Sequence, residues 1–482
     1  MLFNSCQFLI FFPIVLAGYF LIPKKIKNFW LLLSSYIFYM GWNPKYALLL
    51  LFSTAITFFS SVIIEKIRFS DKNTPSNKKT AKVIFCIAIL LAFLLLFYFK
   101  YLNFTLSLLG KILSYFSLTL KIPAFDIVLP VGISFFTFQA VGYLIDVYRG
   151  DIKAERNFFR YALFVSFFPQ LVAGPIERSR NLLSQFEKTY DFDFDRAKEG
   201  LFMMLYGYIL KMVIADRASI LVDFVFSKEA ATGIQIAFAV FIFAFQIYCD
   251  FYGYSAIARG TAKILGIELM KNFDAPYFSV SFKDFWRRWH ISLSTWFRDY
   301  LYIPLGGSKK GRFRKNLNTM IVMLTSGLWH GAGLHFLAWG FFNGLFQIFD
   351  DLTLRFRMKI PNFIQIPVNF VFVCFCWLFF RASSLSKAIF YLKKIIFSPE
   401  IHSLMGGKYG MGKTEVAFLL LSIVILMIID FLKYRIFPVQ EKFFAQKWFV
   451  KSAVFVLSVL IIAIFGVWGA GYNASAFIYF QF

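Results

Sequence analysis

The chain has 482 residues, of which 59% are hydrophobic and 21% aromatic, whereas only 16% are charged. A soluble domain has about 25% charged residues, and the 68 phenylalanines exceed what a surface in water accommodates. Lysine and arginine number 51 against 26 acidic residues, a net charge of +25, but these cations lie mostly in short loops between apolar runs. The composition excludes a soluble globular protein, disfavours a nucleic-acid partner, and indicates a membrane protein.

Apolar runs recur along the whole chain, at lengths that suit helices spanning or half-spanning a membrane. No internal repeat is visible, and no soluble domain longer than a loop interrupts the runs. We predict an all-α polytopic membrane protein in which residues 1–482 form a single membrane domain with about 11–14 membrane helices or half-helices. The candidate runs are residues 8–22, 29–40, 46–64, 83–99, 101–120, 127–147, 158–174, 201–214, 234–257, 317–330, 335–349, 366–380, 416–432 and 450–467.

The charges of the first loops predict how the chain is oriented. Lysines crowd residues 24–27, and residues 65–82 carry six Lys or Arg against two acids. The intervening turn, residues 41–45, is short and nearly uncharged. Because cytoplasmic loops are enriched in Lys and Arg, we expect the first two segments in the cytoplasm and the N-terminus outside.

Two aspartates lie within apolar runs, Asp146 and Asp250. As members of a proton relay they would indicate a proton-coupled transporter, although the paired halves with broken helices of such proteins are not evident. The interpretation we favour is that each accepts hydrogen bonds and fixes the packing around it.

Residues 282–303 combine aromatic and basic side chains and predict an interfacial amphipathic helix. At 3.6 residues per turn His290 belongs to its aromatic face, whereas Arg287, Arg288 and Arg298 point elsewhere. Such a histidine either hydrogen-bonds a neighbouring residue in a helix that anchors the protein at the membrane surface, or has a functional role in the site. The aromatic face comprises Trp286, Trp289, His290, Leu293, Trp296, Phe297 and Tyr300.

His330 ends an apolar run, with glycines at 327, 331 and 333 around it. Small residues let a second backbone or a ligand come close, and an ionisable group at membrane depth is a candidate functional group. The alternative is a buried histidine that is satisfied by its neighbours. His335 lies about 140° further round a helix, so the pair does not face one metal ion, and we predict no metal site.

The loop from Pro304 to Lys315 contains five basic residues and three glycines. The loop could contact the phosphates of a nucleotide-bearing donor at a binding site that opens to the cytoplasm. Alternatively, its charge reflects only the enrichment of Lys and Arg in cytoplasmic loops. The candidate donor contacts are Lys309, Lys310, Arg312, Arg314 and Lys315.

Several strings together resemble the membrane-bound O-acyltransferase family, in particular its bacterial alginate O-acetylase and peptidoglycan O-acetyltransferase members. They include Phe-Trp-Arg-Arg-Trp-His-Ile-Ser-Leu-Ser-Thr-Trp-Phe-Arg-Asp-Tyr from 285, Gly-Leu-Trp-His-Gly-Ala from 327, Gln-Ile-Tyr-Cys-Asp-Phe-Tyr-Gly-Tyr-Ser from 246 and the terminal Phe-Ile-Tyr-Phe-Gln-Phe. Tyr252 and the pair Leu334-His335 depart from the residues common in relatives, without removing a proposed catalytic group.

The resemblance implies a ring of tilted helices around a funnel, with His330 as the catalytic histidine and His290 at the second family position, where Asn, Asp or His occurs. It also implies a bacterial inner-membrane enzyme that moves an acetyl group from acetyl-CoA to an exported polysaccharide, directly or through an extracytoplasmic partner protein. D-alanyl or other acyl transfer to teichoic acid is the alternative. We expect His330 to act as general base or as a transiently acylated nucleophile, and His290 to orient substrate or stabilise the oxyanion.

Overall fold

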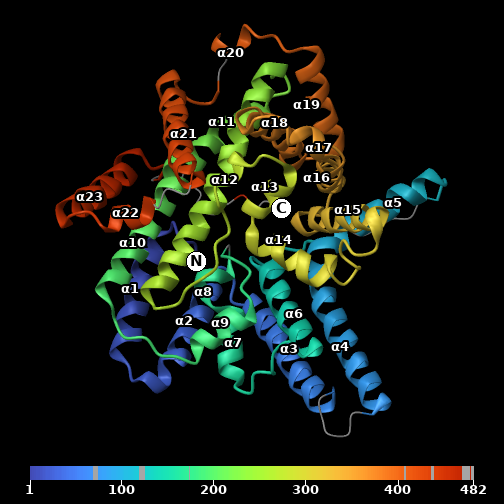
Figure 1. The fold of residues 1–482 in the computed structure, drawn as a ribbon, viewed down its shortest axis with the longest axis vertical. Helices are drawn as coiled ribbons and strands as arrows, with labels where there is room; N and C mark the ends of the chain where they lie inside the picture. The colour runs from blue at the N-terminus through green and yellow to red at the C-terminus, as the bar shows by residue number, and fades with distance from the viewer. Residues whose placement is uncertain are drawn as a thin grey trace. The chain divides into compact units, whose positions relative to one another are not determined.

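The computed structural model describes residues 1–68, 74–118, 125–172, 174–406, 409–435, 439–468 and 478 (Figure 1). All regular structure within these ranges is helical, so the expected all-α class is confirmed. The chain forms two compact units, residues 1–200 with 261–270 and residues 201–260 with 271–482. Of the terminal string 477–482, only Ile478 belongs to the described residues.

Six helical segments of the described chain are long and apolar enough to cross a membrane. They differ in burial. In Gly233–Ile264, 72% of the apolar window is buried within the protein, whereas in Trp448–Phe465 no part of the window is buried. An apolar surface this large is not stable in water, so the exposed helices indicate contact with lipid and a multi-pass membrane protein. The six are α3 (Tyr46–Arg68), the stretch Pro75–Tyr115, α12 (Gly233–Ile264), α18 (Asn362–Arg381), α21 (Lys413–Tyr434) and α23 (Trp448–Phe465).

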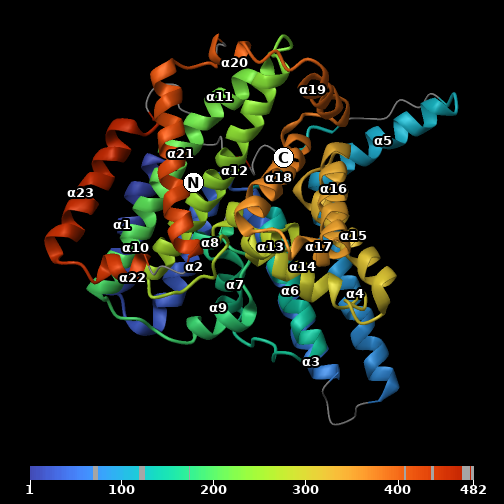
Figure 2. The ribbon, with the colours of Figure 1, turned by 45° about the horizontal axis from the view of Figure 1, so that its top comes forward.

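The first unit contains a packed group of α3, α4 and α6, which lie together in both views (Figures 1 and 2). Ile64 of α3, Ala81 and Ala88 of α4, and Leu144 of α6 form a buried cluster, in which the small alanines allow close approach. The helices of this unit are α1 (Cys6–Leu21), η1 (Lys24–Ile26), α2 (Lys27–Met40), α3, α4 (Pro75–Leu96), η2 (Phe97–Tyr101), α5 (Leu102–Tyr115), α6 (Ile133–Arg149), α7 (Phe158–Ser166), α8 (Phe168–Leu171), α9 (Ser179–Phe186), the start of α10 (Phe194–Tyr208) and the end of α12.

The second unit contains the candidate site. Its helices include η3 (Ile209–Ala215), α11 (Asp216–Ser227), most of α12, η4 (Pro276–Phe278), α13 (Phe282–Arg288), α14 (Ile291–Phe297), η5 (Arg298–Tyr302), α15 (Gly311–His330), α16 (Leu334–Leu352) and α17 (Leu354–Arg357). After α18 follow α19 (Leu385–Phe397), α20 (Ser403–Gly406), α21, α22 (Val439–Phe444) and α23.

Two buried aspartates carry the interactions that the packing interpretation requires. Within the first unit Asp146 Oδ2 accepts a hydrogen bond from Ser179 Oγ at 3.2 Å. Within the second unit Asp250 Oδ2 accepts the Ile478 backbone N–H at 2.8 Å, and its Oδ1 lies 2.7 Å from Lys211 Nζ. Both carboxylates are therefore engaged in holding segments together, which favours packing over a proton relay.

Glycines set the distance between α15 and α16. A Cβ on Gly327 would overlap the Phe336 carbonyl, and one on Gly340 would overlap the Met323 carbonyl. The close backbone approach expected from the glycine at 327 is thus present, and α16 is the element that approaches. This contact fixes the end of α15, where His330 lies.

Gly340→Ala should therefore separate α15 from α16 and destabilise the protein by about 1–3 kcal/mol, because the new methyl meets backbone rather than a movable side chain. The matched control is Gly344→Ala on the same helix, whose Cβ would lie 3.0 Å from the end of the flexible Met320 side chain. Thermal unfolding in detergent should show a lower midpoint for Gly340→Ala alone. Equal midpoints for the two variants would contradict the close packing.

Candidate active site

His330 is the last residue of α15 and is 4% exposed. Its imidazole lies edge-on to three aromatic rings, with centroid distances of 4.9 Å to Trp329, 5.0 Å to Trp339 and 5.3 Å to Phe380. The helix ends here because Gly331 is extended, and a side chain at 331 would overlap the Phe336 ring. The turn therefore holds His330 in an aromatic enclosure at a helix end.

His290 lies in the short link between α13 and α14 and is completely buried. Its ring centroid is 4.6 Å from Phe251 and 5.9 Å from Trp329. Both histidines thus contact the same indole, that of Trp329, and belong to one aromatic compartment. Burial lowers the pKa of His290 to about 3, so its imidazole is neutral at physiological pH.

The expected continuous helix over 282–303 is wrong at its centre. The chain forms α13, then Trp289 in an extended conformation and His290 with φ of 43°, and then α14 followed by η5. The break arises because Asn272 bonds the start of α14: its carbonyl accepts the Ile291 N–H at 3.0 Å and its side chain the Ser292 N–H at 3.3 Å. The predicted aromatic face is nevertheless buried except for Tyr300.

The left-handed backbone of His290 is uncommon for a residue other than glycine, although histidine adopts it more readily than most. Such conformations persist only where the surroundings impose them, and they cluster at functional sites. Here the next helix is anchored through Asn272, and the Ser294 N–H bonds the His290 carbonyl at 2.9 Å. The link places the His290 ring beside Trp329 instead of along a continuous helical stripe.

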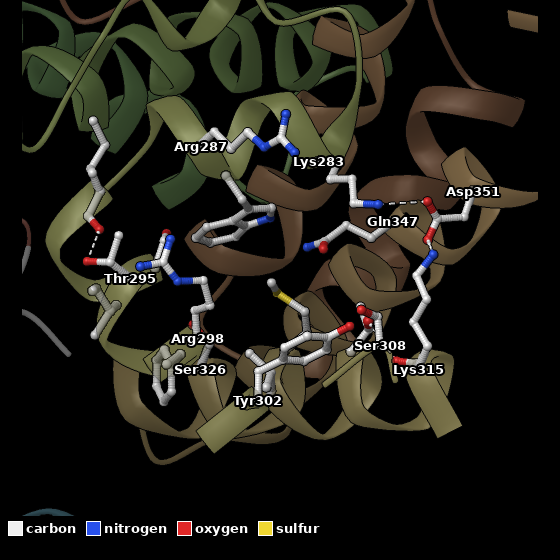
Figure 3. Close-up of a pocket in the computed structure, with 18 residues that line it drawn as sticks. Lys283, Arg287, Thr295, Arg298, Tyr302, Ser308, Lys315, Ser326, Gln347 and Asp351 are labelled. Atoms are coloured by element: carbon white, nitrogen blue, oxygen red, sulfur yellow. Dashed lines mark hydrogen bonds and ion pairs between the residues drawn. The ribbon is translucent and has the colours of Figure 1, made fainter. Parts of the chain in front are cut away.

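A pocket of about 600 Å³ lies in the second unit and is lined by residues of α13, α14, α15 and α16, among others (Figure 3). Residues one helical turn apart on α14 and on α15 line it, including Ile291 and Thr295 on the first and Val322 and Ser326 on the second. His290 directly precedes Ile291, and His330 follows Ser326 by one turn. The full lining is Lys283, Trp286, Arg287, Ile291, Leu293, Ser294, Thr295, Phe297, Arg298, Tyr302, Ser308, Lys315, Thr319, Val322, Met323, Ser326, Gln347 and Asp351.

Four cations line this pocket: Lys283, Arg287, Arg298 and Lys315. One carboxylate, that of Asp351, lies between Lys283 Nζ at 2.8 Å and Lys315 Nζ at 2.5 Å. The net positive charge suits an anionic ligand.

The five candidate donor contacts differ in where the structure places them. Lys315 lines the pocket, whereas Lys309, Lys310 and Arg312 are exposed on the preceding turn and the first turn of α15. The Arg314 Nε donates to the Leu305 carbonyl at 3.3 Å. The role of these five residues in donor binding remains a prediction, with Lys315 the best placed.

Sequence reasoning missed several polar residues of the second unit. Lys283, Gln347 and Asp351 line the pocket, and Lys211 forms a buried cluster with Asp250 and Asp216. Lys211 carried a usable signal, because a lone lysine in an apolar run needs an acidic partner. Asp351 carried a weaker one, since it stands in the last turn of α16, where the helix dipole disfavours acids.

The arrangement suits transfer of a group from an anionic donor to a hydroxyl. Imidazole is the usual general base near neutral pH, and an aromatic enclosure keeps water from the reacting groups. In the described ranges no three His, Cys, Asp or Glu side chains gather as metal ligands. Neither histidine is among the residues that line the pocket; the lining reaches their chain neighbours Ile291 and Ser326. Fold and site together indicate a multi-pass membrane transferase with two buried histidines and a cationic pocket on the helices that carry them.

Comparison with known proteins identifies the kind of transferase. The sequence model of MBOAT, the membrane-bound O-acyltransferase family, matches residues 152–386. The chain is 37% identical over 391 residues to the probable alginate O-acetylase AlgI of Pseudomonas aeruginosa, covering 80% of this chain and 73% of the relative. The chain therefore belongs to the membrane-bound O-acyltransferase family and is an O-acyltransferase.

Two further relatives differ in the acceptor that their names indicate. The peptidoglycan O-acetyltransferase of Helicobacter pylori is 34% identical over 433 residues, covering 82% of this chain and 80% of the relative. The teichoic acid D-alanyltransferase of Streptococcus thermophilus is 30% identical over 244 residues, covering 48% of this chain and 59% of the relative. The similarity to the two acetyl-transferring relatives thus extends over much more of the chain.

Proposed function

We propose that this protein takes an acetyl group from acetyl-CoA on the cytoplasmic side of a bacterial inner membrane and delivers it to hydroxyls of an exported or cell-wall polysaccharide. The observation that carries the proposal is that His290 directly precedes α14 and His330 ends α15, and that both helices contribute residues to the lining of one cationic pocket. The names of the alginate and peptidoglycan relatives support an acetyl group and a glycan acceptor.

In the proposed reaction His330 is the general base. Its neutral nitrogen takes the proton of the acceptor hydroxyl while the oxygen attacks the thioester carbonyl, giving a tetrahedral oxyanion. The C–S bond then breaks, and the imidazolium returns the proton to the leaving thiolate, so that an ester and a free thiol result. His290, neutral and buried, orients the substrate or donates a hydrogen bond to the oxyanion.

A second route has His330 as nucleophile. Its nitrogen would then attack the thioester, release the thiol and carry the acetyl group until a hydroxyl accepts it. The aromatic enclosure serves either route, because water would hydrolyse the donor or the acyl-imidazole.

We propose that an extracytoplasmic partner protein receives the acetyl group or completes its transfer, because the acceptor is an exported or cell-wall polysaccharide outside the membrane. The basic segments 24–27, 65–82 and 308–315 support a cytoplasmic orientation of these loops. The donor would then enter from that side, because a polyanion such as acetyl-CoA does not cross lipid.

Membrane vesicles of defined orientation test the proposal. Inside-out vesicles from cells that make the protein and its polysaccharide should incorporate label from radioactive acetyl-CoA into base-labile esters, and sealed right-side-out vesicles should not. Labelling of the glycan from the outer side, or from activated D-alanine instead of acetyl-CoA, would overturn the assigned direction or donor.

A further inference from the structure

A cluster of three charged residues forms part of the pocket lining. Asp351 accepts Lys283 Nζ on one carboxylate oxygen and Lys315 Nζ on the other (Figure 3). Lys283 belongs to α13, Lys315 to α15 and Asp351 to α16. The carboxylate therefore joins three helices within the lining of the cationic pocket.

The location of Asp351 is not explained by helix stability. The C-terminal end of a helix carries partial negative charge, and an acid there is unfavourable unless cations offset it. Its neighbour Asp350 is held outside the pocket, by Arg357 and by the Lys283 backbone N–H at 3.2 Å. Burial alone would raise the pKa of Asp351, but hydrogen bonds from Lys283 and Lys315 outweigh burial and lower it, so the group is ionised at neutral pH.

The cluster has the geometry of a bound oxyanion. Two oxygens of one group each receive an ammonium, which is how a phosphate also bridges two lysines. A second polar group points to the same kind of ligand: Gln347, one turn before Asp351, lines the pocket with a buried Nε2 that has no acceptor among the described residues. Figure 3 shows its amide end directed into the pocket. A ligand with acceptor oxygens would satisfy it.

We propose that Asp351 is a built-in competitor for the phosphate groups of the acyl donor. Before the donor binds, its carboxylate bridges Lys283 and Lys315, and a donor phosphate then replaces it on these two lysines. The proposal rests on the proposed function, since it takes the donor to be carried on a phosphate-bearing thiol such as coenzyme A. Because the ion pairs form again as the spent carrier leaves, Asp351 limits donor affinity and assists product release.

Binding of coenzyme A to the purified full-length protein in detergent tests this, because it requires no acyl transfer. Asp351→Asn removes the competitor but keeps the shape of the side chain, and should tighten binding about tenfold, as expected for a charge-assisted contact. Lys315→Met should weaken binding about tenfold for the same reason. Pantetheine, which lacks the phosphates, should bind all variants alike.

Asp350→Asn is the matched control, because it makes the same charge change one residue away and outside the pocket lining. It should alter coenzyme A binding less than about twofold, because dissolved salt screens the effect of a charge that does not contact the ligand. If a folded Asp351→Asn protein binds coenzyme A no more tightly than the wild type, the competitor role of Asp351 is wrong. The proposed donor would still stand in that case, because the wild type binds coenzyme A.

If Asp351→Asn fails to fold, Lys315→Met decides: wild-type affinity in that variant would place the phosphates elsewhere and overturn the proposal. A wild-type protein that binds no coenzyme A would overturn the proposed donor as well.

Discussion

Replacing His330 by alanine should abolish acyl transfer, lowering the turnover number by about 10³-fold or more, because general-base catalysis contributes about 10²–10⁴-fold and a nucleophilic route would be lost entirely. The variant should still insert and accumulate, since the change removes one ring at the end of α15 and leaves the glycine contacts of this helix with α16 in place. The measurement is acetyl ester in the polysaccharide per unit of membrane protein, and unchanged acetylation would refute the assignment.

His335→Ala is the matched control for His330. His335 lies five residues later, in the first turn of α16, and is partly exposed. The same loss of an imidazole there should leave transfer within about twofold, as substitutions away from the site usually do. Equal loss in both variants would show that the turn between α15 and α16 is disturbed, not that a catalytic group is missing.

A trapping experiment separates the two roles of His330. Incubation of the wild type with labelled acetyl-CoA in the absence of acceptor should leave no label on the denatured protein if His330 is a base. Label that is retained on the wild type and absent from His330→Ala would establish the acyl-histidine route.

The local features of the site were predictable because they depend on short stretches of chain. Glycine at 327 in an apolar run predicted close approach of another backbone or of a ligand, and the backbone of α16 lies there. Helical spacing grouped the aromatic residues around Trp289 on one face, and most of them are buried, although the helix itself is broken. The lengths of the apolar runs were sufficient for the helical class, since each run needs only its own composition to cross a membrane.

The features that depend on distant contacts could not be predicted. The break at His290 results from Asn272, whose carbonyl and side chain accept hydrogen bonds from the first residues of α14. Asn272 precedes these residues by about twenty positions, so no local sequence pattern encodes the pairing. The Lys283–Asp351 ion pair joins residues 68 positions apart. The acid at 351 could be recognised as out of place, but its partners became evident only from the packing of α13, α15 and α16.

The second large effect should come from His290, and it depends on what replaces the ring. His290→Ala removes a neutral polar group from the aromatic compartment and places alanine in a left-handed backbone, which costs about 1–2 kcal/mol. Loss of one oxyanion or orienting donor lowers turnover by about 10²–10³-fold. We expect a fall of that size in turnover, with membrane insertion retained.

His290→Asn is the decisive companion. Asparagine tolerates the left-handed conformation and offers an N–H donor and a carbonyl acceptor, so it should recover at least about tenfold over alanine if His290 orients substrate or stabilises the oxyanion. Because burial keeps the pKa of His290 at about 3, the group is neutral throughout the working range. The pH profile of His290→Asn between about pH 5 and 8 should therefore match that of the wild type. An acid limb that disappears in His290→Asn would show that His290 titrates during turnover and would contradict its role as a neutral partner of His330.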